Sequence, residues 1–151
     1  MTKLENKNIH YIICGKGKLL NKLKTLAKEL QVDDKISFLG FRKDIIEITK
    51  VSDIFIFPSL QEGLPVALME AMASGLPVIC SNIRGNEDLI IDEKGGYLIE
   101  PYDVDRFAEK INSLIENKEL IEKFKNNNLS EIKLFDTFEV GLRMRQIYSL
   151  R

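Results

Sequence analysis

The chain has 151 residues, which is enough for one domain with a hydrophobic core and too few for two. Hydrophobic residues make up 44% of it and charged residues 30%, as in ordinary globular domains. The formal net charge of −1, with both signs mixed along the chain, argues against nucleic-acid binding, which needs a concentrated basic face. No apolar run approaches the roughly 20 residues that span a bilayer, and residues 1–8 lack the apolar stretch of a signal peptide. We therefore expect a cytoplasmic protein.

The first half of the chain reads as alternating strands and helices. A short apolar run predicts a strand over 9–14, and leucines at helical spacing predict an amphipathic helix over 18–31. A strand over 36–39, a short helix over 44–50 and a strand over 53–57 follow, the last ending at Pro58, which cannot donate to a central ladder. Residues 65–74 predict a helix that ends at Gly75.

The second half adds two strands and then becomes helical. The predicted strands cover 78–80 and 97–99. Asp103 is a suitable N-cap for a helix whose core face carries Phe107, Ile111 and Leu114. Further helices are predicted over 119–125 and 138–150, with a break at the three asparagines 126–128.

Short apolar strands that alternate with helices indicate an α/β fold: a Rossmann-like open parallel sheet with helices on both faces. In such sheets ligands bind beyond the carboxyl ends of the strands, where loops lead into helices. Three loops have this position, at 15–17, 58–64 and 81–87. The functional site is expected there.

Glu70 lies in the middle of a predicted helix that is otherwise apolar. A buried carboxylate without a partner is strongly unfavourable, so Glu70 needs either an ion pair or an opening to solvent. At about 100° per residue, Leu68 and Met72 project away from Glu70 and form the packing face. The side chains on its own side are small or moderate: Val66, Ala67, Ala73 and Ser74. A carboxylate placed in this way suits the paired hydroxyls of a ribose.

Glu62 stands eight positions earlier, in the loop before the same helix. The amides of Gly63 and Leu64 lie between the two acids, at the helix N-terminus, where an anion such as phosphate binds well. The residues alone also allow a simpler interpretation, in which Glu62 and Gly63 form a solvated turn and Glu70 pairs with a lysine.

The segment from Pro58 to Ile79 resembles the E-x7-E signature of retaining glycosyltransferases with two Rossmann domains (the GT-B architecture), in the family called group one. Glu62 and Glu70 are the two acids of the signature. Further motifs follow the family's order along residues 9–148: Ile12-Ile13-Cys14-Gly15-Lys16-Gly17, Phe38-Leu39-Gly40, Gly95-Gly96-Tyr97-Leu98 and Pro101-Tyr102-Asp103. The run Ile83-Arg84-Gly85-Asn86 is most similar to enzymes of exopolysaccharide and capsule biosynthesis.

The resemblance implies a role for each matching residue. Glu70 holds the ribose hydroxyls of a nucleotide-diphospho-sugar donor, expected to be UDP-linked, and Glu62 acts catalytically by orienting the transferred sugar. The remaining donor-binding residues are implied to be Gly63, Leu64 and Pro65 on the diphosphate and sugar, Phe41 and Arg42 beside the base, and Gly15 and Gly17 at the border of the cleft. The resemblance implies no cofactor. It also implies no metal ion, because the one Asp-x-Asp spacing, Asp103-Val104-Asp105, begins with a residue that is better used as a helix cap. A nicotinamide-dependent oxidoreductase is disfavoured because Leu20 stands in the place of the third glycine of a dinucleotide fingerprint.

Two parts of such enzymes have no counterpart in the sequence. Family members carry an Arg and a Lys that clamp the diphosphate, on a strand–helix unit preceding the one matched by residues 9–15, and they have an N-terminal acceptor domain. Residues 1–151 are therefore expected to be a single, N-terminally incomplete donor-binding domain of a hexosyltransferase that retains configuration, inactive when isolated. The missing half, or a separate chain supplying it, is the expected partner and the expected site of any peripheral membrane association. The alternative is a non-catalytic nucleotide-sugar-binding or interaction module that needs a partner chain.

Overall fold

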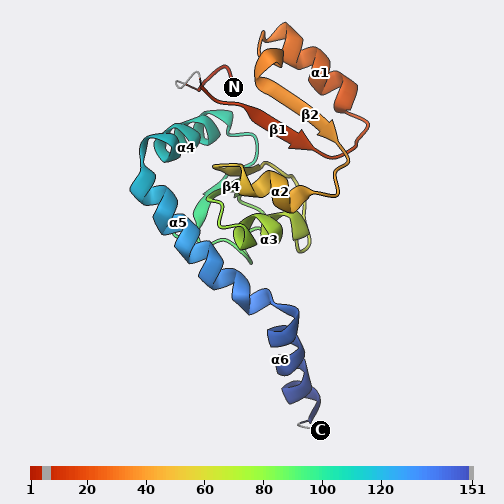
Figure 1. Ribbon diagram of the computed structural model, residues 1–151, viewed down its shortest axis with the longest axis vertical. Coiled ribbons are helices and arrows are strands. Elements are labelled where there is room, and N and C mark those ends of the chain that lie inside the picture. Colours follow the sequence, from red (N-terminus) through yellow and green to blue (C-terminus); the bar gives the residue numbers. More distant parts are fainter. Residues whose placement is uncertain (5–7, 150–151) are drawn as a thin grey trace.

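The computed structural model describes residues 1–4 and 8–149 and contains each of the predicted strands (Figure 1). The elements up to the last strand are β1 (Tyr11–Cys14), α1 (Leu20–Glu29), the short 3-10 helix η1 (Asp33–Lys35), β2 (Ile36–Gly40), α2 (Ile45–Lys50), β3 (Phe55–Phe57), α3 (Val66–Ala73), β4 (Val78–Ser81) and β5 (Gly96–Ile99). The chain then continues as α4 (Val104–Glu116), α5 (Lys118–Glu131), the 3-10 helix η2 (Ile132–Phe135) and α6 (Thr137–Ser149). Residue 150, the last of the predicted final helix, lies outside the described residues.

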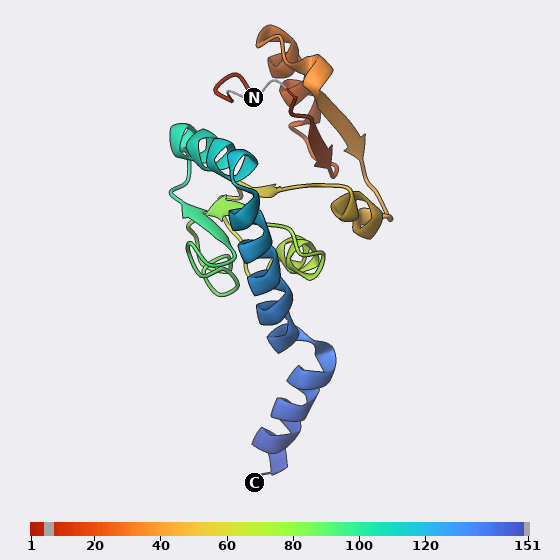
Figure 2. The same cartoon turned by 60° about the vertical axis from the view of Figure 1, so that its left-hand side comes forward.

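All strand pairs are parallel, as predicted. β1 pairs with β2, and β3, β4 and β5 form a second sheet with β4 in the middle. The described strands thus make two sheets where the sequence predicted one, because none of them lies between β1 and β3. Figure 2 shows the two-stranded sheet standing apart from the three-stranded one.

The core of the molecule forms on the two faces of the three-stranded sheet. Along β4, Val78 and Cys80 face the cluster that contains Leu68 of α3, whereas Ile79 faces the cluster that contains Leu114 of α4. All five side chains are fully buried, and burial of each large one stabilises the fold by about 1.5–3 kcal/mol. The alternation confirms helices on both faces of this sheet and places α3, the helix that carries the second acid of the signature, against β4.

The predicted break at residues 126–128 is wrong. α5 runs without interruption through the three asparagines to Glu131. Asn128 is fully buried, and its side-chain nitrogen donates to the carbonyl oxygens of Leu76 (2.7 Å) and Gly95 (2.8 Å). Tertiary hydrogen bonds therefore outweigh the weak helix propensity of asparagine.

Two helices leave apolar side chains exposed. On α1 only Ala27 is buried, and Leu23 and Leu26 of its predicted core face each remain more than 40% exposed. α6 projects from the body of the molecule, and no residue of this helix is buried (Figures 1 and 2). In the described part of the chain, no helix combines the length and the apolar character needed to cross a membrane.

Candidate functional site

The loop between β3 and α3 carries the first acid of the signature at the carboxyl end of the strand. Glu62 is half-buried there, whereas Gly63 and Leu64 are exposed, Leu64 by 54%. Pro65 is the N-cap of α3 in an extended conformation, so the helix begins one residue later than predicted. Within the described residues the amides of Gly63 and Leu64 make no hydrogen bond. Both donors are available at the positive end of α3.

Glu70 lies on the half-exposed side of α3. Leu68 and Met72 are fully buried on the opposite side, which confirms the prediction from helical geometry. Among residues 1–4 and 8–149 the Glu70 carboxylate has no hydrogen bond and no ion pair, so its charge is accommodated by exposure and not by a lysine. The helix is not buried all round, since Val66 is 61% exposed beside it.

A groove of about 590 Å³ runs along this side of α3. Glu70, Val66 and Ala73 form one wall, and the segment from η2 to the start of α6 forms the other, with the charged residues Lys133, Asp136 and Glu139. The sequence did not predict this second wall, because nothing in a segment more than 60 residues away signals that it packs near Glu70. Lys133 places one positive charge in a groove that holds three carboxylates, those of Glu70, Asp136 and Glu139.

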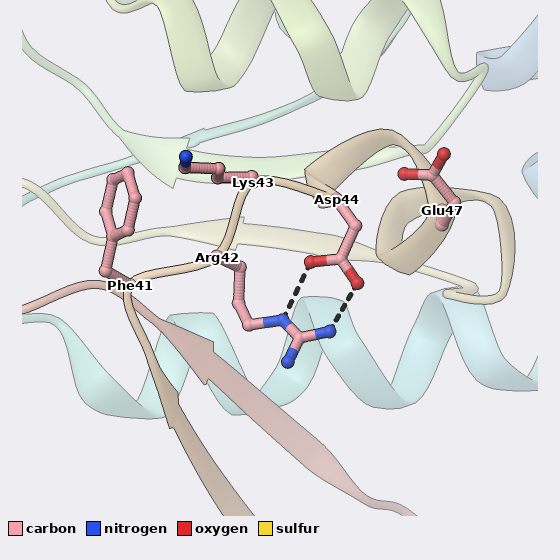
Figure 3. A pocket seen from close by; sticks show the side chains of 5 residues that line it. All are labelled: Phe41, Arg42, Lys43, Asp44 and Glu47. Atoms are coloured by element: carbon pink, nitrogen blue, oxygen red, sulfur yellow. Dashed lines mark hydrogen bonds and ion pairs between the residues drawn. The ribbon is translucent and has the colours of Figure 1, made fainter.

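The other predicted donor-binding residues meet at the carboxyl ends of β1 and β2. The Gly15 amide donates to the Gly40 carbonyl oxygen (2.7 Å), and the Lys16 ammonium lies 5.6 Å from the centre of the Phe41 ring. Phe41 is 62% exposed and lines a pocket of about 460 Å³ with Arg42 and the polar side chains that follow, Lys43, Asp44 and Glu47 (Figure 3). The loop with Gly15 and Gly17 thus adjoins Phe41.

Arg42 is held by Asp44 and does not stand free (Figure 3). Its Nε donates to Oδ1 of Asp44 at 2.8 Å, and its Nη2 contacts Oδ2 of the same carboxylate. These hydrogen bonds raise the pKa of Arg42 and keep the pKa of Asp44 below its usual value. The predicted residues therefore lie in two groups: Glu62 to Pro65 with Glu70 around α3, and Gly15, Gly17, Phe41 and Arg42 beyond β1 and β2.

No metal centre is formed by the residues that the structure describes, in that no three His, Cys, Asp or Glu side chains gather closely enough to hold an ion. The candidate site instead offers a free carboxylate, two free amides and nearby cationic and aromatic side chains. Such groups bind hydroxyl-bearing, anionic small molecules.

Solved structures define the class of fold. HepE of Anabaena in complex with UDP-glucose superposes with a TM-score of 0.90 at 22% sequence identity, covering 99% of this chain and 43% of that protein. WaaG, a glycosyltransferase involved in lipopolysaccharide biosynthesis, gives a TM-score of 0.82 at 23% identity, covering 97% of this chain and 40% of that one. The chain has the α/β fold found in GT-B glycosyltransferases.

The sequence places the chain within this class. The family described as "Glycosyl transferases group 1" matches residues 1–130, and the chain belongs to that family. The UDP-Gal:alpha-D-GlcNAc-diphosphoundecaprenol alpha-1,3-galactosyltransferase of Escherichia coli is 38% identical over 141 residues, 93% of this chain and 36% of the relative. The putative glycosyltransferase EpsD of Bacillus subtilis is 30% identical over 94% of this chain and 37% of its own length. The chain thus spans little more than a third of the length of these curated relatives.

Proposed function

We propose that this chain is the donor-binding part of a retaining hexosyltransferase that uses a UDP-linked sugar in the biosynthesis of a polysaccharide or lipid-linked glycan. The observation that carries the proposal is the carboxylate of Glu70, which faces a groove and has no partner in the described part of the chain. Glu70 stands eight positions after Glu62, the first acid of the signature. The E. coli relative is named for a UDP-galactose donor, and HepE was solved with UDP-glucose, which supports UDP over other nucleotides.

Each group of the site has a task in this proposal. Glu70 accepts hydrogen bonds from the two ribose hydroxyls, and such bonds to a charged acceptor are the stronger kind. The amides of Gly63 and Leu64 at the start of α3 receive the diphosphate, whose charge grows as the sugar leaves. Glu62 orients the transferred sugar. With the donor's own diphosphate as the base for retention, the protein has only to position the reactants and stabilise leaving-group charge.

The acceptor site is proposed to belong to polypeptide outside this chain. β1 and β3 each have one edge without a strand neighbour among the described residues, and the leucines of α1 are exposed beside the two-stranded sheet. Unpaired strand edges take up a further strand readily. The strand–helix unit that precedes the counterpart of residues 9–15 in family members would join the two sheets and cover these leucines.

One observation favours the non-catalytic alternative for the chain alone. Arg42, a cation that could neutralise a diphosphate near the candidate base site, is already paired with Asp44. A donor held without a cationic clamp loses leaving-group stabilisation more than ground-state binding, because the charge develops during transfer. The isolated chain would then bind a nucleotide sugar without turning it over.

Calorimetric titration with UDP, GDP and ADP tests the proposal. We expect saturable binding of UDP and its weakening by about 1–3 kcal/mol in Glu70→Ala, because charged hydrogen bonds are lost. The stability of this variant should hardly change, since Glu70 has no partner to lose. Glu116→Ala, which removes an exposed carboxylate at the end of α4, is the matched control and should bind like wild type. A folded chain that binds none of the three nucleotides, or a Glu70→Ala variant that loses stability but not affinity, would contradict the proposal.

A further inference from the structure

Gly85 lies in the turn after β4, where the chain presses against the loop that carries Glu62. It is buried and has a φ of +91°, a conformation that favours glycine. A methyl group on its Cα would lie 2.3 Å from the carbonyl oxygen of Gly63 and 3.0 Å from that of Glu62. The two loops therefore touch backbone to backbone, with no room for a side chain between them.

The turn that carries Gly85 is held by more hydrogen bonds than the loop it touches. The amides of Asn86 and Glu87 both donate to the Ile83 carbonyl oxygen (3.1 Å). Asn86 is fully buried, and its side-chain nitrogen donates to the Ser81 carbonyl oxygen at the end of β4 (2.9 Å). The facing loop is held less, because Gly63 and Leu64 are exposed and their amides bond to nothing in the described residues. A group inserted at Gly85 would therefore displace the 62–64 segment.

We propose that Gly85 is a positioning residue for the donor: its lack of a side chain sets the depth of the 62–64 segment. Through this segment it determines where Glu62 and the amides of Gly63 and Leu64 meet the sugar and the diphosphate. Gly85 itself does not touch the donor. The inference rests on the proposed function, since it assigns a further residue to that same site.

The size of the displacement decides whether it matters. Ordinary contact with an added methyl group begins at 3.4 Å, so the Gly63 carbonyl at 2.3 Å must retreat by about 1 Å. A misplacement of about 1 Å in a positioned site lowers the catalytic rate by up to about 100-fold. The amides of Gly63 and Leu64, which are proposed to donate hydrogen bonds to the diphosphate, would move with this carbonyl. Nucleotide affinity is therefore the property expected to change.

The test compares Gly85→Ala with Gly75→Ala by calorimetric titration with UDP. Gly75 has a similar φ of +75°, but the nearest atom to its added methyl group would belong to the flexible side chain of Lys125, at 3.0 Å, and not to the 62–64 segment. Both variants suffer backbone strain and should melt at a lower temperature than wild type. Only Gly85→Ala is expected to lose UDP affinity, by at least tenfold. Gly85→Asn relieves the strain, because asparagine tolerates positive φ, yet keeps the clash and should lose affinity as well.

A second readout does not depend on the nucleotide. In NMR spectra without ligand, the amide resonances of Glu62, Gly63 and Leu64 should shift in Gly85→Ala and stay in place in Gly75→Ala. If wild type fails to bind UDP, the proposed function fails, and these resonances still decide whether Gly85 sets the loop. Wild-type UDP affinity together with unchanged 62–64 resonances in Gly85→Ala would overturn the inference.

Discussion

At the scale of single residues, a side chain at Gly63 is expected to impair nucleotide binding without destabilising the fold. A Cβ at this position meets nothing within 4 Å, and the residue does not need a positive φ. Gly63→Val should therefore change the free energy of unfolding by no more than about 0.5 kcal/mol, as surface substitutions do. Its side chain would nevertheless occupy the space in front of the two free amides, and UDP affinity should fall at least tenfold, about 1.4 kcal/mol.

Thermal melting and calorimetric titration of Gly63→Val, with Gly63→Ala as a smaller step in the same direction, measure the two properties separately. A variant that binds UDP like wild type would show that the diphosphate does not approach this turn. Gly85 is the opposite case, because a side chain there meets neighbouring backbone at once.

The sequence predicted those residue-level features that depend on local geometry. The opposition of Glu70 to Leu68 follows from the helical repeat, and Asp103 caps α4 as predicted, accepting from the Arg106 amide at 2.9 Å. The pairing of Arg42 with Asp44 was not predicted, although the two residues are close in sequence. Both acidic and basic residues follow Arg42 in the sequence, and the backbone conformation of the turn determines which of them it pairs with.

At the scale of elements, the buried amide of Asn128 links α5 to the loops that precede β4 and β5. Replacing it with leucine leaves the Leu76 carbonyl oxygen without its donor, whereas the Gly95 carbonyl oxygen keeps the Val78 amide at 3.3 Å. An unsatisfied buried group costs about 1–3 kcal/mol. Asn128→Leu should therefore lower the free energy of unfolding by about 1–3 kcal/mol. Asn126→Leu, at an exposed position of the same helix, should be close to neutral because leucine is the better helix former. Chemical denaturation measures both, and equal stabilities of the two variants would contradict the structural role of Asn128.

The same residue explains why the sequence did not predict the full length of α5. A run of three asparagines favours a break on local propensity, whereas the carbonyl oxygens that accept from the Asn128 side-chain nitrogen lie 52 and 33 residues away in the chain. Strand positions and parallel pairing depend on short apolar runs and were predicted. The separation into two sheets depends on which strands become neighbours, and no local pattern reports that.

At the scale of the whole molecule, apolar surface and unpaired strand edges are concentrated on parts of the chain that the three-stranded core does not cover. α1 exposes leucines, α6 projects with Phe138 and Ile147 at least 60% exposed, and β1 and β3 have free edges among the described strands. HepE and WaaG share the fold of this chain, which covers less than half of either protein. The proposal that the acceptor site belongs to polypeptide outside this chain predicts that such polypeptide covers these surfaces.

A chimera tests this idea, in which the part of the E. coli relative that this chain does not match is joined to residues 1–151. We expect one cooperative melting transition at a higher temperature than that of the chain alone, because exposed leucines and open edges become buried. The amides of β1 and β3 that face away from β2 and β4 should gain protection from hydrogen exchange, and transfer from UDP-galactose should appear only in the chimera. Glu70→Ala in the chimera should reduce transfer without changing this protection, which separates donor binding from assembly. If β1 and β3 exchange as fast in the chimera as in the chain alone, their free edges are not where the other half joins, and the two halves must meet through α6 or the loops at the candidate site.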